Sequence, residues 1–119
     1  HLPHRFDEGY GLTREGVESA LKRFPARVLL AVDCGSTAVE TIAWLREQGI
    51  DVLVLDHHQV SDPPPQANAL VNPRAPLPPG ADGPFTELCS AGLAFKLIHA
   101  LMKRGRERDN AVAQSFDLK

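Results

Sequence analysis

Residues 28–58 read VLLAVDCGSTAVETIAWLREQGIDVLVLDHH. Two short aliphatic runs, at 28–32 and 52–55, flank a stretch in which apolar residues recur at helical spacing. Such runs are typical of strands that are buried on both faces of a parallel sheet. Strand, helix and strand joined by short connections predict a βαβ unit with a right-handed crossover. The expected fold class is therefore α/β, with a mostly parallel sheet flanked by helices in three layers.

The helix between the two strands is expected to run from about residue 38 to residue 48. Thr37 and Glu40 have the spacing of a capping box at its start. Gly49 suits the position that follows the end of a helix. Ala38, Ile42 and Leu45 supply its inward-facing stripe.

Two further helices are expected outside this unit. Thr13 is a good N-cap for a first helix that extends to about Phe24. Residues 88–104 form a long apolar stretch that predicts a last helix, with Gly105 just past its end. The tail after this helix has no predicted element.

The predicted sheet is short of strands. Eight of the 10 prolines fall between residues 61 and 84, and within that stretch only residues 69–71 suit a short edge strand. Sheets covered by helices usually have about five or six strands. The chain is therefore expected to be an incomplete portion of a larger domain.

Composition narrows the class of protein. The chain has 119 residues, of which 43% are hydrophobic and 24% are charged, as in one small globular domain. Its net charge of −2 gives no overall basic surface for nucleic acid.

No apolar run reaches the ~20 residues of a membrane span, and no signal peptide begins the chain, so a cytoplasmic location without membrane contact is expected. Cys34 and Cys89 are expected to be reduced thiols near the core.

Polar residues follow both predicted strands. Asp33 comes directly after the first strand, and Asp56, His57 and His58 come directly after the second. Parallel strands end at the same edge of a sheet, where ligand sites of α/β folds lie. A carboxylate and imidazoles together suit divalent metals such as manganese, zinc or iron, and a pair of ions can hydrolyse a phosphoester. The alternative interpretation is that Asp33 caps the following helix or forms a turn, and that the histidines belong to an ordinary loop.

These residues also resemble a known family. Residues 32–35, Val-Asp-Cys-Gly, resemble the second motif of the DHH phosphoesterases, and residues 56–58, Asp-His-His, match the triplet that names the family. Residues 3–12, 70–74 and 87–96 are similar to the RecJ branch, in the same order. The resemblance covers nearly the whole chain.

The resemblance implies an activity and roles for five residues. RecJ-like proteins are 5′-to-3′ exonucleases that act on single-stranded DNA in repair and recombination, by two-metal hydrolysis with Mn²⁺ or Mg²⁺. By this resemblance Asp33 would bridge two metal ions and His57 would bind one directly. His58 would contact the scissile phosphate or orient the attacking water. Asp56 would hold an imidazole in its tautomer, and Arg5 would bind a substrate phosphate.

Parts of the family pattern are absent from this sequence. The first motif, a run of alternating aspartates, is missing, and so are the last metal-binding aspartate and the second domain. Residues 1–119 are therefore expected to be a partial DHH catalytic domain with little or no activity alone. Two alternatives remain open: a non-catalytic nucleic-acid-binding scaffold of the same fold, and a phosphoesterase for short oligonucleotides, cyclic dinucleotides or pyrophosphate.

Overall fold

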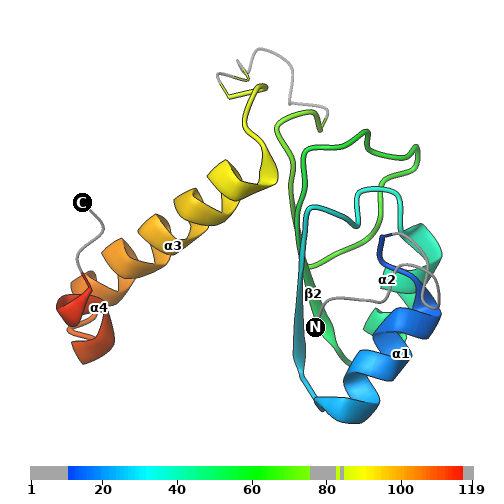
Figure 1. The fold of residues 1–119 in the computed structure, drawn as a ribbon, viewed down its shortest axis with the longest axis horizontal. Coiled ribbons are helices and arrows are strands. Elements are labelled where there is room, and N and C mark those ends of the chain that lie inside the picture. Colours follow the sequence, from blue (N-terminus) through cyan, green and yellow to red (C-terminus); the bar gives the residue numbers. More distant parts are fainter. Residues whose placement is uncertain (1–10, 76–82, 84, 117–119) are drawn as a thin grey trace.

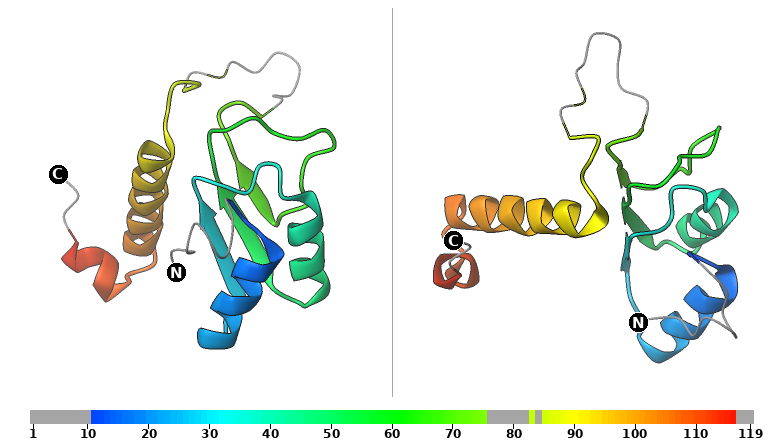
Figure 2. Two further views of the ribbon diagram at one scale, coloured as in Figure 1. Left: turned by 45° about the vertical axis from the view of Figure 1, so that its right-hand side comes forward. Right: turned by 45° about the horizontal axis from the view of Figure 1, so that its top comes forward.

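The computed structural model describes residues 11–75, 83 and 85–116. In chain order the elements of this part are α1 (Arg14–Arg23), β1 (Val28–Val32), α2 (Val39–Glu47), β2 (Asp51–Leu55), β3 (Ala69–Val71), α3 (Ser90–Glu107) and α4 (Ala111–Ser115). Helices α1 and α2 lie on one side of the sheet and α3 extends away on the other side (Figures 1 and 2). This arrangement confirms the predicted α/β class.

The described sheet has three strands in the order β1-β2-β3, and both neighbouring pairs are parallel. Val28 pairs with Asp51 and Val32 pairs with Leu55, so β1 and β2 end level with each other. The βαβ unit is confirmed, and β3 is the short edge strand that the sequence predicts. The pairing of β3 with β2 is short and comprises three residue pairs.

The core lies between the sheet and the pair of helices α1 and α2. Its members are small or branched apolar side chains from α1, α2, β1 and β2, namely Val17, Ala31, Ile42, Leu45, Val52 and Val54. Ile42 and Leu45 are completely buried, which confirms the predicted inward stripe of α2. Burying a side chain of this size stabilises the fold by about 1.5–3 kcal/mol. This packed face fixes the strand ends that carry the polar residues.

The first helix follows its sequence signals. The side chain of Thr13 accepts a hydrogen bond from the amide of Gly16 at 3.2 Å, as expected for the N-cap of α1. The helix ends at Arg23, one residue before the expected end, and Phe24 is its C-cap. The N-terminal cap of α1 is therefore confirmed.

The start of α2 differs from the prediction. Its N-cap is Ala38, with no hydrogen bond from a capping side chain, so the capping box of Thr37 and Glu40 is wrong. The amide of Ala38 instead donates to the carbonyl of Gly35 at 3.1 Å. The tight backbone turn after β1, rather than a side chain, leads the chain into this helix.

The end of α2 has the geometry that Gly49 predicts. Gly49 has a φ of +74°, and its amide donates to the carbonyl of Arg46 at 3.0 Å. The amide of Ile50 reaches back to the carbonyl of Leu45 at 3.1 Å. These two bonds form a Schellman motif, which turns the chain from α2 into β2.

The second face of β1 is exposed in the part of the chain that the structure describes. Val28, Leu30 and Val32 keep 54%, 46% and 41% of their surface accessible. The expectation that this strand is buried on both faces is therefore wrong for the described structure. The physical reason is that α3, the described helix on that side, runs away from the sheet instead of along it (Figure 2).

The C-terminal helices form a pair. α3 continues through Gly105, so the expectation that this glycine lies past the helix end is wrong. A Cβ at Gly105 would lie 2.5 Å from the Cβ of Ala113, so the glycine allows α4 to pack closely. Helix α4 was not predicted from the sequence, although Asn110 caps it by accepting from the amide of Ala113 at 3.1 Å. Within the described ranges, no helix combines the length and the apolar character needed to cross a membrane.

Candidate metal centre

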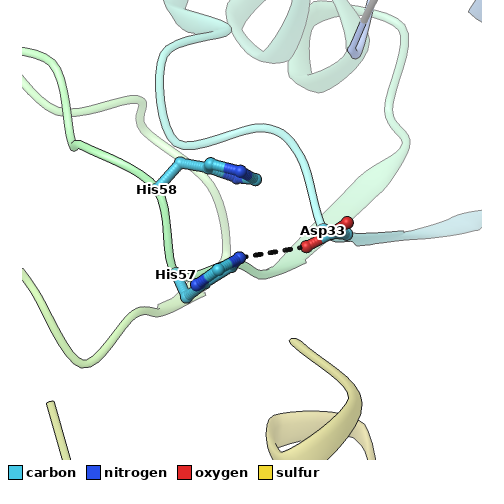
Figure 3. Close-up of side chains that lie close together, drawn as sticks. All are labelled: Asp33, His57 and His58. Carbon is cyan, nitrogen blue, oxygen red and sulfur yellow. Dashed lines mark ion pairs between the residues drawn. The ribbon is translucent and has the colours of Figure 1, made fainter. Parts of the chain in front are cut away.

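Two strand ends bring three metal-ligating side chains together. Asp33 follows β1, and His57 and His58 lie in the loop that follows β2. Each of the three offers a ligand atom within 4.8 Å of the others. Oδ1 of Asp33 lies 3.4 Å from Nε2 of His57, and the side chains face one another across the strand ends (Figure 3). Parallel pairing of β1 and β2 therefore assembles the cluster that the sequence places at the two strand ends.

The cluster is open to solvent on one side, and a buried carboxylate lies on its other side. The side chains of Asp33, His57 and His58 are 63%, 31% and 58% exposed. Asp56 lies beneath them, and its side chain is only 2% exposed. An ion or a phosphate can therefore reach the first three residues from solvent, whereas Asp56 can act on a ligand only through its neighbours.

Asp33 has an unusual backbone conformation. Its φ is +66°, in the left-handed region, which aspartate tolerates better than most residues other than glycine. Its amide donates to the carbonyl of Leu55 at 2.9 Å, so the β1–β2 ladder continues up to this residue. The N-cap of α2 is Ala38, so the alternative in which Asp33 caps that helix is wrong. The side chain is instead aimed at His57 (Figure 3).

Asp56 organises the loop of which it is the first residue. Its Oδ1 accepts from the amide of His57 at 2.8 Å and from the amide of His58 at 3.3 Å. The same oxygen lies 2.7 Å from Nδ1 of His58. Its Oδ2 accepts from the amide of Ser36 at 3.1 Å, which ties the β2 loop to the β1 loop.

These hydrogen bonds keep Asp56 ionised. Burial by itself would raise the pKa of this carboxyl, but the hydrogen bonds from Ser36 and His58 outweigh it and lower the pKa from 3.8 to about 2. A carboxylate can only accept, so Nδ1 of a neutral His58 carries the proton. Nε2 of His58 is then the nitrogen left with a free lone pair for a metal or a polar ligand.

The remaining residues of the first loop are tightly packed. Gly35 has a φ of +110°, and a Cβ there would lie 3.2 Å from Cγ1 of Val54. Burial, and then the negative charges of Asp56 and Asp33, raise the pKa of the half-buried Cys34 thiol. Cys89, by contrast, is exposed, so the expectation of a position near the core is wrong for this residue.

We expect Gly35→Ala to destabilise the fold by about 1 kcal/mol or more, because alanine disfavours a positive φ and its methyl group would crowd Val54. Gly49→Ala is the matched control. Its φ of +74° is also positive, but nothing lies within 4 Å of the added Cβ. Urea unfolding of both variants separates backbone strain from crowding. Equal losses for the two variants would contradict close packing at Gly35.

Two buried polar residues support the site without having been predicted from the sequence. Ser36 and Asn72 are 1% and 8% exposed, and they hydrogen bond to each other at 2.8 Å. The signals in the sequence were that each is polar and comes soon after a predicted strand, and that Asn72 lies in the stretch 70–74 that is similar to the RecJ branch. Arg5, the residue expected to bind a substrate phosphate, lies outside the described residues.

Comparison with known proteins places the chain in a family. Residues 1–117 match the family described as DHH family, N-terminal domain. The chain belongs to the DHH family. The strand-end cluster of Asp33, His57 and His58 is therefore found in a DHH domain whose naming triplet is intact.

Its curated relatives include single-stranded-DNA-specific exonucleases named RecJ. The RecJ of Bacillus subtilis is 38% identical over 86% of this chain, and the RecJ of Haemophilus influenzae is 37% identical over 89%. The same alignments cover 12% and 18% of those two relatives. This DHH chain thus spans less than a fifth of the length of these relatives.

Solved structures agree with this placement. A crystal structure of exonuclease RecJ bound to manganese superposes on 87% of the chain with a TM-score of 0.69 and 36% identity, and the match covers 25% of that protein. RecJ from Thermus thermophilus in complex with Mn²⁺ superposes on 76% of the chain with a TM-score of 0.59 and 35% identity, and the match covers 13% of that protein. The α/β fold of this DHH chain is therefore that of a segment of RecJ.

Proposed function

We propose that this chain is part of a metal-dependent phosphodiesterase that degrades single-stranded DNA, as its RecJ relatives are named for doing. The observation that carries the proposal is the group of Asp33, His57 and His58 at adjacent strand ends of a DHH domain. The 5′-to-3′ direction, a role in DNA repair and recombination, and a cytoplasmic location belong to the same proposal.

The donor set fits the proposed metal. One carboxylate and two imidazoles within 4.8 Å suit a divalent ion such as Mn²⁺, and two solved RecJ structures are manganese complexes. Asp33 and His57 would hold the ion, with Mg²⁺ as the alternative. A bound ion supplies Lewis acidity and lowers the pKa of water. Two ions need more carboxylates than this cluster offers, so we propose that residues 1–119 are a partial catalytic domain within a longer complete protein.

Each residue of the cluster has a separate task in this proposal. The exposed carboxylate of Asp33 has two oxygens and can therefore bridge two ions. His58, with Nδ1 held by Asp56, presents Nε2, which accepts from the attacking water when the ring is neutral and donates to the scissile phosphate when the ring is protonated. Asp56 fixes that orientation without reaching the ligand itself, because its side chain is buried. Arg5 would bind a substrate phosphate.

The test is hydrolysis by the complete protein with Mn²⁺. A 5′-phosphorylated single strand should be shortened from its 5′ end, the matching duplex should be resistant, and removal of the metal with EDTA should stop the reaction until Mn²⁺ is restored. Faster cleavage of dinucleotides than of long DNA would replace the proposed substrate with short oligonucleotides. Binding of DNA without hydrolysis of any phosphodiester would indicate a scaffold instead.

A further inference from the structure

Three buried polar side chains form a hydrogen-bonded chain beneath the candidate metal centre. Ser36, Asp56 and Asn72 follow β1, β2 and β3, and they are 1%, 1% and 8% exposed. Nδ2 of Asn72 donates to Oγ of Ser36 at 2.8 Å, and the amide of Ser36 donates to Oδ2 of Asp56 at 3.1 Å. The ends of all three described strands are thereby joined through polar groups that water hardly reaches.

Both polar atoms of the Asn72 side chain have partners. Besides Ser36, its Nδ2 donates to the backbone carbonyl of His58 at 2.9 Å, and its Oδ1 accepts from the amide of Arg74 at 2.8 Å. A flipped amide would turn Oδ1 toward the carbonyl of His58 and Nδ2 toward the amide of Arg74. Both contacts would then be repulsive, so the observed orientation is the one that the surrounding groups require.

His58 is consequently held at three points, the first of which is its amide, which donates to Oδ1 of Asp56 at 3.3 Å. Asp56 holds its ring nitrogen Nδ1 at 2.7 Å, and Asn72 holds its backbone carbonyl at 2.9 Å. The loop that contains His57 and His58 cannot shift without breaking bonds among buried groups, and an unpaired buried polar group costs about 1–3 kcal/mol. Restraint of this loop matters most for His57, its proposed metal ligand, because a residue of a functional site has to be placed to within about 0.5 Å.

We propose that Asn72 and Ser36 are positioning residues, which set the place of the loop 56–58 relative to Asp33 and thereby the affinity of the site for metal. The inference rests on the proposed function, because it takes this cluster as the metal centre. Hydrogen-bond partners of metal ligands typically contribute about 10- to 100-fold to metal affinity or activity. The hydrogen-bond partners of Asn72 among the described residues include no ligand atom of the cluster, so within this part of the chain it acts through the backbone of His58 and through Ser36 and Asp56.

The experiment measures Mn²⁺ binding by calorimetry to the complete protein, with metal alone and no DNA. We expect Asn72→Asp to lower Mn²⁺ affinity by about 10- to 100-fold, because it keeps the size of the side chain and replaces the donor to His58 with an acceptor. Ser36→Ala should give a smaller loss, since the amide of residue 36 still reaches Asp56. It is also the milder change, so it tests the proposal if Asn72→Asp does not fold.

Asn68→Ala is the matched control at the other end of β3. Oδ1 of Asn68 accepts from the amide of Val52 at 2.8 Å, and its Nδ2 donates to Asp51 at 2.7 Å. The Asn68→Ala variant therefore loses comparable hydrogen bonds, but far from the strand ends that carry the site. It should keep the Mn²⁺ affinity of the wild type. Equal Mn²⁺ affinity in folded Asn72→Asp, folded Ser36→Ala and the wild type would overturn the proposal.

Two readouts separate this inference from the proposed function. With saturating Mn²⁺ and a single-stranded DNA substrate, Asn72→Asp should lower kcat more than it changes KM, because the displaced loop 56–58 carries His58, which acts at the scissile phosphate. A purely structural role would lower the amount of folded enzyme without changing Mn²⁺ affinity. If the wild type binds Mn²⁺ but cleaves no DNA, the proposed function fails, and the binding comparison still decides the roles of Asn72 and Ser36.

Discussion

Asp33→Asn is expected to lower DNA hydrolysis by the complete protein more than about 100-fold, and Asp33→Ala should be at least as severe. Residues that merely support metal ligands contribute up to about 100-fold, so loss of a direct or bridging ligand should exceed that value. Asparagine is the sharper test. It tolerates the φ of +66° at this position, so a loss of activity reports the missing negative charge rather than backbone strain.

The measurement is the initial rate on 5′-phosphorylated single-stranded DNA across a range of Mn²⁺ concentrations. Asp51→Asn serves as the control, because Asp51 lies at the start of β2, at the opposite end of the strand from the cluster. It should retain the wild-type rate. Wild-type activity in Asp33→Asn at low Mn²⁺ would remove Asp33 from the metal site, and His57→Ala would then be the variant that tests whether the cluster binds metal.

Asp56→Ala is expected to destabilise the chain by about 3 kcal/mol or more. The carboxylate accepts hydrogen bonds from the amides of Ser36, His57 and His58 and contacts the ring of His58. Each buried donor left without a partner costs about 1–3 kcal/mol. The loss would be a large part of the roughly 5–15 kcal/mol that stabilises a typical domain. Urea unfolding at neutral pH measures it, and Asp51→Ala, at an exposed position, should cost under about 1 kcal/mol.

The contribution of Asp56 should also depend on pH in a defined window. Its pKa is lowered from 3.8 to about 2 in the folded chain, so its ionisation stabilises the fold above about pH 4 and that stabilisation is lost as the pH falls toward 2. The shift corresponds to about 2 kcal/mol. The difference in unfolding free energy between wild type and Asp56→Asn should therefore be constant above about pH 5 and shrink between about pH 4 and 2. A difference that stays constant down to about pH 2 would contradict the lowered pKa.

The fold was largely predictable where local pattern decides structure. The aliphatic runs at 28–32 and 52–55 locate β1 and most of β2, because side chains buried in a parallel sheet leave little room for polar residues. Thr13 and Gly49 mark one end each of α1 and α2, since capping depends on residues adjacent in sequence. The capping box predicted from Thr37 and Glu40 is absent from α2. Residue spacing alone does not show that the backbone turns in the way that a capping box needs.

The elements that the sequence mispredicted depend on distant partners. Gly105 has the features of a helix end, yet α3 continues through it because α4 packs against the bare Cα surface. Val28, Leu30 and Val32 read as buried, yet they line a face of β1 that no described element covers. Hydrophobicity reports a preference for burial, whereas the arrangement of elements decides whether a covering surface is present.

The sequence by itself determined the α/β class and the positions of the two strands that its aliphatic runs form. It also determined that Asp33 and the triplet 56–58 come directly after these strands. Tertiary structure alone decided that Nε2 of His57 lies 3.4 Å from Asp33, and that Asn72 reaches Ser36 across 36 positions of sequence. The physical reason is that local periodicity specifies which face of an element is apolar. Strand register and packing then decide which polar groups meet, because hydrogen bonds require donor and acceptor to lie within about 3 Å.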